Sequence, residues 1–336
     1  MKKILLLLCL YSTFATAQTG GENVYQFLNI TTSARQAALG GEIYTLRDDV
    51  NQALWNPATI NEKMHNNIGI NYINYLAGIS FGSASYAYKV NDKIGTFHAG
   101  VTYVGYGELI GADAQGNETG TFKANDFSVS LGYAYQIPNS HFILGANLKM
   151  INSVIDSYSS FGLATDLGIL YHNPDKQYSF TLVVKNLGTQ ITKFDNTKED
   201  LPLEIALSAD YQLENVPLKW YVTLDNLQQW QVAYENPSNA TTDIEGNRTE
   251  EDITFFDNAF RHLIIGAELF PQKAFNIRVG YNVRRGKELS LADSRTFAGI
   301  SAGFGLKLNR IKFSYAFTKY HPADNASTFS LLINLN

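Results

Sequence analysis

Cysteine is almost absent from this chain of 336 residues, which contains only Cys9. That residue lies in an N-terminal stretch with the pattern of a secretory signal peptide. Two lysines precede a short apolar run, and Ala15-Thr16-Ala17 forms a cleavage site of the A-x-A type. We predict that residues 1–17 are removed on export. The mature chain then contains no thiol, which excludes disulfides, cysteine nucleophiles and cysteine-based metal sites.

Long hydrophobic runs are also missing. A helix that crosses a bilayer needs about 20 consecutive apolar residues, and the apolar run at the N-terminus is too short for that. The composition therefore excludes a polytopic helical membrane protein. The formal net charge of −5 gives no reason to expect a nucleic-acid partner.

Strict alternation of large apolar with small or polar residues is what the chain does have. It is clearest in residues 125–137 and 141–153, two runs separated by Pro138-Asn139-Ser140. Successive side chains of a strand point to opposite faces, so each run has one apolar and one polar face. Each run is also long enough for a tilted strand to cross the hydrocarbon layer.

The same alternation continues from Ile68 to the C-terminus. It predicts strands at 68–77, 79–90, 94–106, 125–137, 141–153, 161–172, 178–188, 202–213, 217–229, 261–270, 274–285, 297–308, 311–320 and 327–335. Tight turns alternate with longer links, which we expect at 107–124, 154–160, 189–201, 230–260, 286–296 and 321–326. An even number of strands with short and long links in turn is typical of outer-membrane barrels. We predict an all-β protein, with a transmembrane antiparallel β-barrel of about 14 strands over residues 67–336, surrounded by outer-membrane lipid.

Residues 18–66 lack this alternation. Ser33 is a candidate cap for a short helix that Gly40-Gly41 ends, and a second helix is expected at Val50 to Leu54. The predicted inward face of the barrel carries charges of both signs, which indicates either a water-filled pore or a lumen closed by ion pairs around a plug. The second interpretation is favoured, because residues 18–66 supply a hatch. The candidate hatch residues are Arg35, Asp48, Asp49, Trp55, Asn56 and Pro57.

No catalytic motif is recognisable. The chain has no nucleophile elbow, no zinc-binding H-E-x-x-H and no phosphate-binding glycine loop. None of the six histidines has a second ligand at the spacing of a metal site. The acidic loop 230–260 is expected to be solvated, with divalent-ion binding or docking to a basic partner as the weaker alternatives. We therefore predict no enzyme activity, no cofactor and no metal site.

Several segments together resemble the PorV/PorQ family of the type IX secretion system of Bacteroidota, and its PorQ branch more closely. They are Val24 to Asn29, Ser33 to Gly41, Asp48-Asp49, Trp55 to Ala58, Gly95 to Gly100 and Ser314 to Pro322. The resemblance implies a FadL-like barrel of fourteen strands with an N-terminal hatch and no enzymatic activity. Outer-membrane barrels generally end in an aromatic residue, whereas this sequence ends in Leu335-Asn336.

The resemblance also implies partners. Family members of the PorQ kind hold the surface protein PorZ at the outer membrane, near the PorU sortase and PorV, in the complex that attaches secreted cargo to lipopolysaccharide. Four aromatic residues of the longest outer loop are candidate partner contacts: Tyr234, Phe255, Phe256 and Phe260. Exposed apolar aromatics need cover, which a partner, the loop itself or the membrane interface provides. The alternatives to a partner-anchoring scaffold are a FadL-like channel for hydrophobic small molecules and a general porin.

Overall fold

The computed structural model describes residues 23–75, 78–234, 241–242, 248–249, 253–289, 297–321 and 324–336. The predicted signal peptide, residues 1–17, lies outside these ranges and stays a prediction. Within them, no helix has the length and apolar character needed to span a bilayer.

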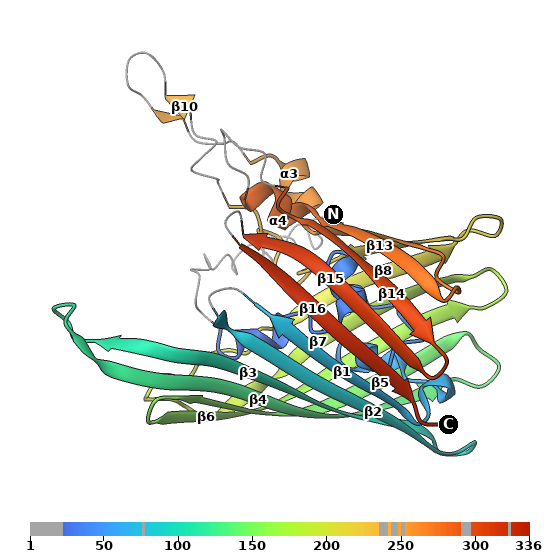
Figure 1. Ribbon diagram of the computed structural model, residues 1–336, viewed down its shortest axis with the longest axis horizontal. Helices are drawn as coiled ribbons and strands as arrows, with labels where there is room; N and C mark the ends of the chain where they lie inside the picture. Colours follow the sequence, from blue (N-terminus) through green and yellow to red (C-terminus); the bar gives the residue numbers. More distant parts are fainter. Residues whose placement is uncertain are drawn as a thin grey trace, which may run out of the picture.

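Fourteen antiparallel strands close into one barrel, as the alternation predicted (Figure 1). The strands are β1 Asn67–Asn74, β2 Ser80–Asn91, β3 Gly95–Ala112, β4 Glu118–Gln136, β5 Phe142–Ile155, β6 Tyr158–Asn173, β7 Tyr178–Thr192, β8 Glu204–Gln212, β9 Leu218–Leu224, β12 Leu263–Leu269, β13 Phe275–Asn282, β14 Ile300–Leu308, β15 Ile311–His321 and β16 Asp324–Asn334. Each pairs with its neighbour along the chain, and β1 closes the barrel on β16. Closure leaves no unpaired sheet edge in the wall, which a lipid environment requires.

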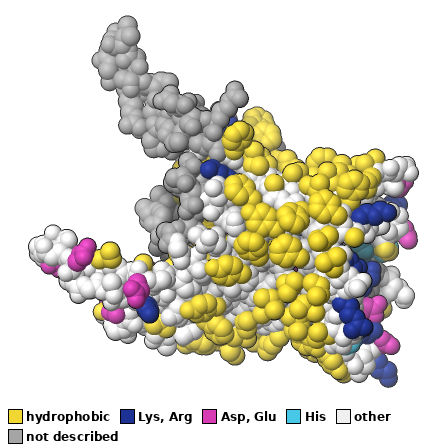
Figure 2. Space-filling view, viewed as in Figure 1, with side chains coloured by type: hydrophobic (Ala, Val, Ile, Leu, Met, Phe, Trp, Pro, Cys, Tyr) yellow, Lys and Arg dark blue, Asp and Glu magenta, His cyan; other side chains and the backbone are white. Residues whose placement is uncertain are grey.

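The two faces of the wall differ as the alternation predicts. Along β13, Phe275, Ile277 and Val279 are exposed on the outside, whereas Asn276 and Arg278 between them are buried on the inside. Other strands repeat this pattern, and Figure 2 shows the resulting cover of hydrophobic side chains around the barrel. The outer surface is therefore suited to lipid and the inner surface to polar contacts.

The two ends of the barrel also differ. Six short turns lie at one end, together with the first residue of β1 and the last residue of β16. The described parts of the long connections 193–203, 225–262 and 283–299 lie at the other end (Figure 1). The long connection after β9 contains the small strands β10 (Thr241–Thr242) and β11 (Arg248–Thr249) and helix α3 (Phe255–Arg261). Short turns of such barrels face the periplasm and long loops face outward.

Three predicted connections are wrong: 107–124, 154–160 and 321–326. The last is mostly strand, because β15 reaches His321 and β16 begins at Asp324. Residues 107–124 are mostly strand, because β3 and β4 continue past the wall and pair with each other, and this ribbon projects from the long-loop end in Figure 1. Four glycines in that stretch hide the alternation in the sequence. Residues 154–160 form a tight turn, with Asp156 at φ 54° between β5 and β6. The predicted strand 274–285 ends at Asn282, whose side chain accepts from the Arg285 amide and starts helix α4 (Val283–Glu288).

The segment before β1 fills the barrel with short helical turns. They are η2 (Gln26–Asn29), α2 (Ala34–Ala38), η3 (Val50–Leu54), η4 (Pro57–Thr59) and η5 (Glu62–Met64). The predicted helix at Val50 to Leu54 is a 3-10 helix, and Asp49 caps it by accepting from the Asn51 amide at 3.0 Å. Helix α2 packs on β13 to β16 and η4 on β4 to β6, so the segment contacts opposite walls and forms a plug.

Candidate functional site

Arg35 of the plug lies at the centre of the largest ionic network in the lumen. Its guanidinium donates to Asp48 at 2.6 Å and to Glu268 of β12 at 2.7 Å. Glu268 also accepts from Arg278 of β13 at 2.9 Å and from the Tyr221 hydroxyl of β9 at 3.0 Å. Arg35, Glu268 and Arg278 are all buried. The network therefore joins the plug to three strands of the wall.

A second network lies around Trp55. The Lys185 ammonium group of β7 lies 3.6 Å from the centroid of the Trp55 ring and 2.8 Å from the Glu204 carboxylate of β8. Tyr44 of the plug donates its hydroxyl to the same carboxylate at 2.5 Å. A cation over an indole face and beside a carboxylate is held from two sides. Trp55 thus anchors the plug to the wall at β7 and β8.

Asn56 and Pro57 turn the plug chain toward the wall. The Asn56 side chain caps η4 by accepting from the Ala58 amide at 3.0 Å, and its own amide donates to the Tyr44 carbonyl and the Thr181 hydroxyl. The turn lies so close to β5 that a Cβ on Gly145 would lie 2.2 Å from the Ala58 nitrogen. Glycine is required there by the close approach of the two backbones.

These networks place charges of both signs inside the barrel, each with a partner. A third pair, Lys149 with Asp166 at 2.8 Å, lies on β5 and β6. All six candidate plug residues lie in the segment that fills the lumen, and five of them are buried; the sixth, Asp48, has a half-exposed side chain near the short-turn mouth. The arrangement fits a lumen closed by ion pairs around a plug.

The candidate loop aromatics gather on one exposed platform at the long-loop end. Phe255, Phe256 and Phe260 on α3 are 65%, 70% and 58% exposed, and Tyr234 is 57% exposed. The sequence reasoning missed Trp230, which is half-exposed and whose ring centroid lies 5.0 Å from that of Phe255. We name Trp230, Tyr234, Phe255, Phe256 and Phe260 the aromatic platform. Trp230 is the first residue of the predicted loop 230–260. This position was the only sequence feature that could have placed it among the candidate partner contacts.

Polar contacts hold this platform in place. Thr254 and Asp257 form a reciprocal capping box at the start of α3. Asn258 accepts from the amides of Val232 and Ala233 and donates to the Trp230 carbonyl. The Thr254 hydroxyl and amide donate to the Asp257 carboxylate and lower the pKa of that group. The aromatic rings are therefore exposed on an ordered support.

The described residues contain no group of three or more histidine, cysteine or acidic side chains that could hold a metal ion. The acidic positions Asp243, Glu245, Glu250, Glu251 and Asp252 lie outside the described residues, so divalent-ion binding by this loop remains untested.

Comparisons with known proteins agree with this architecture. Residues 17–216 match the family model described as type IX secretion system protein PorV. The toluene transporter TbuX of Ralstonia pickettii has a similar structure, with a TM-score of 0.54 and 12% identity over 92% of this chain and 98% of that chain. A mutant of TodX, described as a monoaromatic hydrocarbon channel, gives a TM-score of 0.53 and 12% identity over the same shares. No curated protein sequence matches the chain. The structural similarities show a shared fold.

Proposed function

Because the chain belongs to the PorV family of type IX secretion system proteins, we propose that it anchors a surface partner of the cargo-attachment complex at the outer membrane. The partner we propose is a PorZ-like protein, through which the barrel joins PorU and PorV. This role corresponds to the PorQ branch of the family. The barrel itself supplies no catalysis in this proposal.

The aromatic platform is the observation that supports this role best. Five aromatic side chains lie exposed on an ordered support at the end of the barrel that faces outward. Tyr, Trp and Phe are enriched at the energetic centres of interfaces, since burying them on binding removes a large apolar area from water. A closed, plugged barrel holds such a platform rigidly, and the loops supply the specificity.

The test is co-purification of the surface partner with the barrel from gently solubilised membranes. The double substitution Phe255→Ser and Phe256→Ser should release the partner, because it removes two exposed apolar rings without touching the polar contacts that support α3. Ile110→Ser is the matched control, since Ile110 is a similarly exposed apolar residue (66%) on the ribbon of β3 and β4. Retention of the partner by the double variant, or equal loss in the control, would refute the platform as the docking site.

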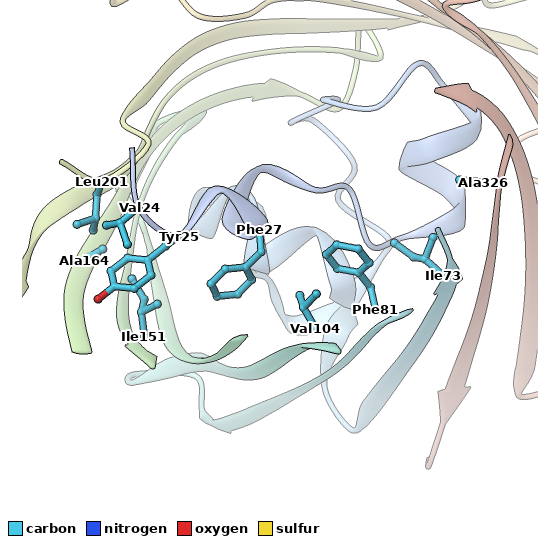
Figure 3. Packing of buried hydrophobic residues seen from close by; sticks show 10 residues of the cluster. All are labelled: Val24, Tyr25, Phe27, Ile73, Phe81, Val104, Ile151, Ala164, Leu201 and Ala326. Atoms are coloured by element: carbon cyan, nitrogen blue, oxygen red, sulfur yellow. The ribbon is translucent and has the colours of Figure 1, made fainter. Parts of the chain in front are cut away.

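A FadL-like channel for hydrophobic small molecules is the second candidate. An apolar cluster in the long-loop half of the lumen favours it. In this cluster Phe27 of the plug lies on the side of Val104 and Phe81, and Tyr25 lies beside Ile151 and Ala164 (Figure 3). The two similar structures are of a toluene transporter and of a monoaromatic hydrocarbon channel. The buried ion pairs deeper in the lumen oppose it, because an apolar solute would have to pass charged groups. Uptake assays with fatty acids and toluene separate the candidates, and concentration-dependent uptake would favour the channel.

A further inference from the structure

A hollow of about 490 Å³ lies at the short-turn mouth of the barrel, between the plug and the ends of β14, β15 and β16. Its lining includes four cationic side chains, Lys273, Lys307, Arg310 and Lys312, and one acidic side chain, Asp48. We name this feature the basic hollow. Figure 2 shows dark-blue Lys and Arg side chains at the short-turn end of the molecule, with magenta Asp and Glu side chains among them.

Three of the four cations of the basic hollow have no ion-pair partner among the described residues, and the fourth, Lys312, has only a distant one. Asp48 lies 2.6 Å from Arg35 and only 3.9 Å from Lys312, so its charge is already shared. Lys273, Lys307 and Arg310 have no carboxylate partner among the described residues. By contrast, Lys89 of β2, at the same mouth, lies 2.8 Å from the Glu62 carboxylate and 2.6 Å from the Asp92 carboxylate.

Two of these cations oppose each other in the sheet. Lys307 of β14 pairs directly with Lys312 of β15, and like charges at directly opposite positions destabilise a sheet. An anion bound between them would relieve this repulsion. The repulsion between Lys307 and Lys312 therefore favours a negatively charged ligand at this position.

The direction of these side chains identifies the source of the anion. The neighbours Leu308 and Ile311 are exposed on the outer, lipid-facing side. Lys307 and Lys312 occupy the alternate positions, which face the lumen. A lipid headgroup would meet the outward residues, whereas a ligand entering from the periplasm meets the lysines. The side-chain amides of Gln272, Asn309 and Asn334 also line the hollow and offer hydrogen bonds to a peptide backbone.

We propose that the basic hollow binds a carboxylate-rich peptide segment of a periplasmic protein. The barrel then carries two docking sites, the aromatic platform on the outer side of the membrane and the basic hollow on the periplasmic side. The second site does not depend on the function proposed for the first, since the two lie at opposite ends of the barrel.

The test measures binding of a dye-labelled peptide of alternating Glu and Ser to the full-length protein in phosphatidylcholine nanodiscs. We expect saturable binding that weakens as salt rises from about 0.01 to about 0.15 M, because counterions screen exposed charges. The variant Lys307→Gln with Arg310→Gln should bind roughly tenfold more weakly, since it removes two ion pairs with the peptide. It should fold normally, because it removes a like-charge repulsion.

Lys93→Gln with Lys176→Gln is the matched control, because it removes two exposed cations from other short turns at the same end. Wild-type affinity in this control supports the proposal, and an equal loss in both double variants overturns it in favour of a diffuse charge effect. Absence of saturable peptide binding also overturns it. So does displacement of the peptide by equimolar inorganic phosphate, or by phosphatidylglycerol in the nanodisc, since either would assign the hollow to a phosphate group.

Discussion

Glu268 is the residue on which the attachment of the plug depends most. Its buried carboxylate accepts from Arg35 at 2.7 Å and Arg278 at 2.9 Å. We expect Glu268→Gln to destabilise the folded protein by roughly 3–5 kcal/mol, because it leaves the buried Arg278 guanidinium without a carboxylate and removes one of the two carboxylates that pair with Arg35. Urea denaturation in detergent, followed by the gel migration of folded and unfolded barrel, measures the loss.

Glu62→Gln is the control for this residue. Its carboxylate pairs with Lys89 at the short-turn end, where the Glu62 side chain is 70% exposed. Exposed ion pairs contribute little to stability, so the denaturation midpoint should stay near that of the wild type. A similar shift in the two variants would contradict the role of Glu268 as an anchor.

At the scale of elements, α3 should respond to acid in a definite direction. Hydrogen bonds from Thr254 lower the pKa of Asp257. A carboxyl group with a lowered folded-state pKa stabilises the fold above its unfolded pKa, about 3.9, and this contribution is lost as the pH falls through the folded pKa. We expect α3 to loosen only below about pH 4, where the capping box is protonated.

The three tryptophans make this measurable by fluorine NMR of fluorotryptophan-labelled protein. The Trp230 signal should shift on acidification, since its ring packs against Phe255 of α3. Thr254→Ala should shift it already at neutral pH, whereas the signal of the buried Trp55 should move little in either case. A Trp230 signal that Thr254→Ala leaves unchanged at neutral pH would contradict a structural role for the capping box.

The ribbon of β3 and β4 is an element that the barrel does not need. Beyond Gly105 its strands pair only with each other, from Glu108 opposite Lys123 to Ala112 opposite Glu118. Replacing residues 109–122 by an Asn-Gly turn should leave the denaturation midpoint and partner co-purification unchanged, because it removes no wall pairing and no platform residue. Loss of the partner would move the docking site from the platform to the ribbon.

Elements differ in how far the sequence predicts them. The wall strands were predictable because each has lipid on its outer face and the polar plug on its inner face. Apolar and polar residues therefore alternate along each strand, as they do from Phe275 to Val279. The ribbon of β3 and β4 contacts neither, so its glycines were mistaken for a loop. The plug residues were recognisable because their segment lacks the alternation. Their ion-pair partners in the wall could not be predicted, since residues such as Arg35 and Glu268 are 233 positions apart in the chain.

At the scale of the whole molecule, a strong wall surrounds a weakly structured plug. Every strand of the wall is paired on both sides, and the barrel therefore unfolds as one unit. In residues 23–66, the part of the plug that the structure describes, the helices are turns of three to five residues, and helices this short are not stable alone. The plug is held by its contacts with the wall, above all by the buried ion pairs.

This difference predicts the conductance of the protein in planar lipid bilayers. Without denaturant the wild type should be silent, because the plug fills the lumen. At moderate urea concentrations, conductance steps should appear and should vanish on dilution, because the plug unfolds while the wall stays closed. The Glu268→Gln variant should open at a lower urea concentration, since it has lost the anchor between plug and wall. Steps in the wild type without urea would instead support an open pore, and simultaneous loss of plug and wall would show that the ion pairs bind them into a single cooperative unit.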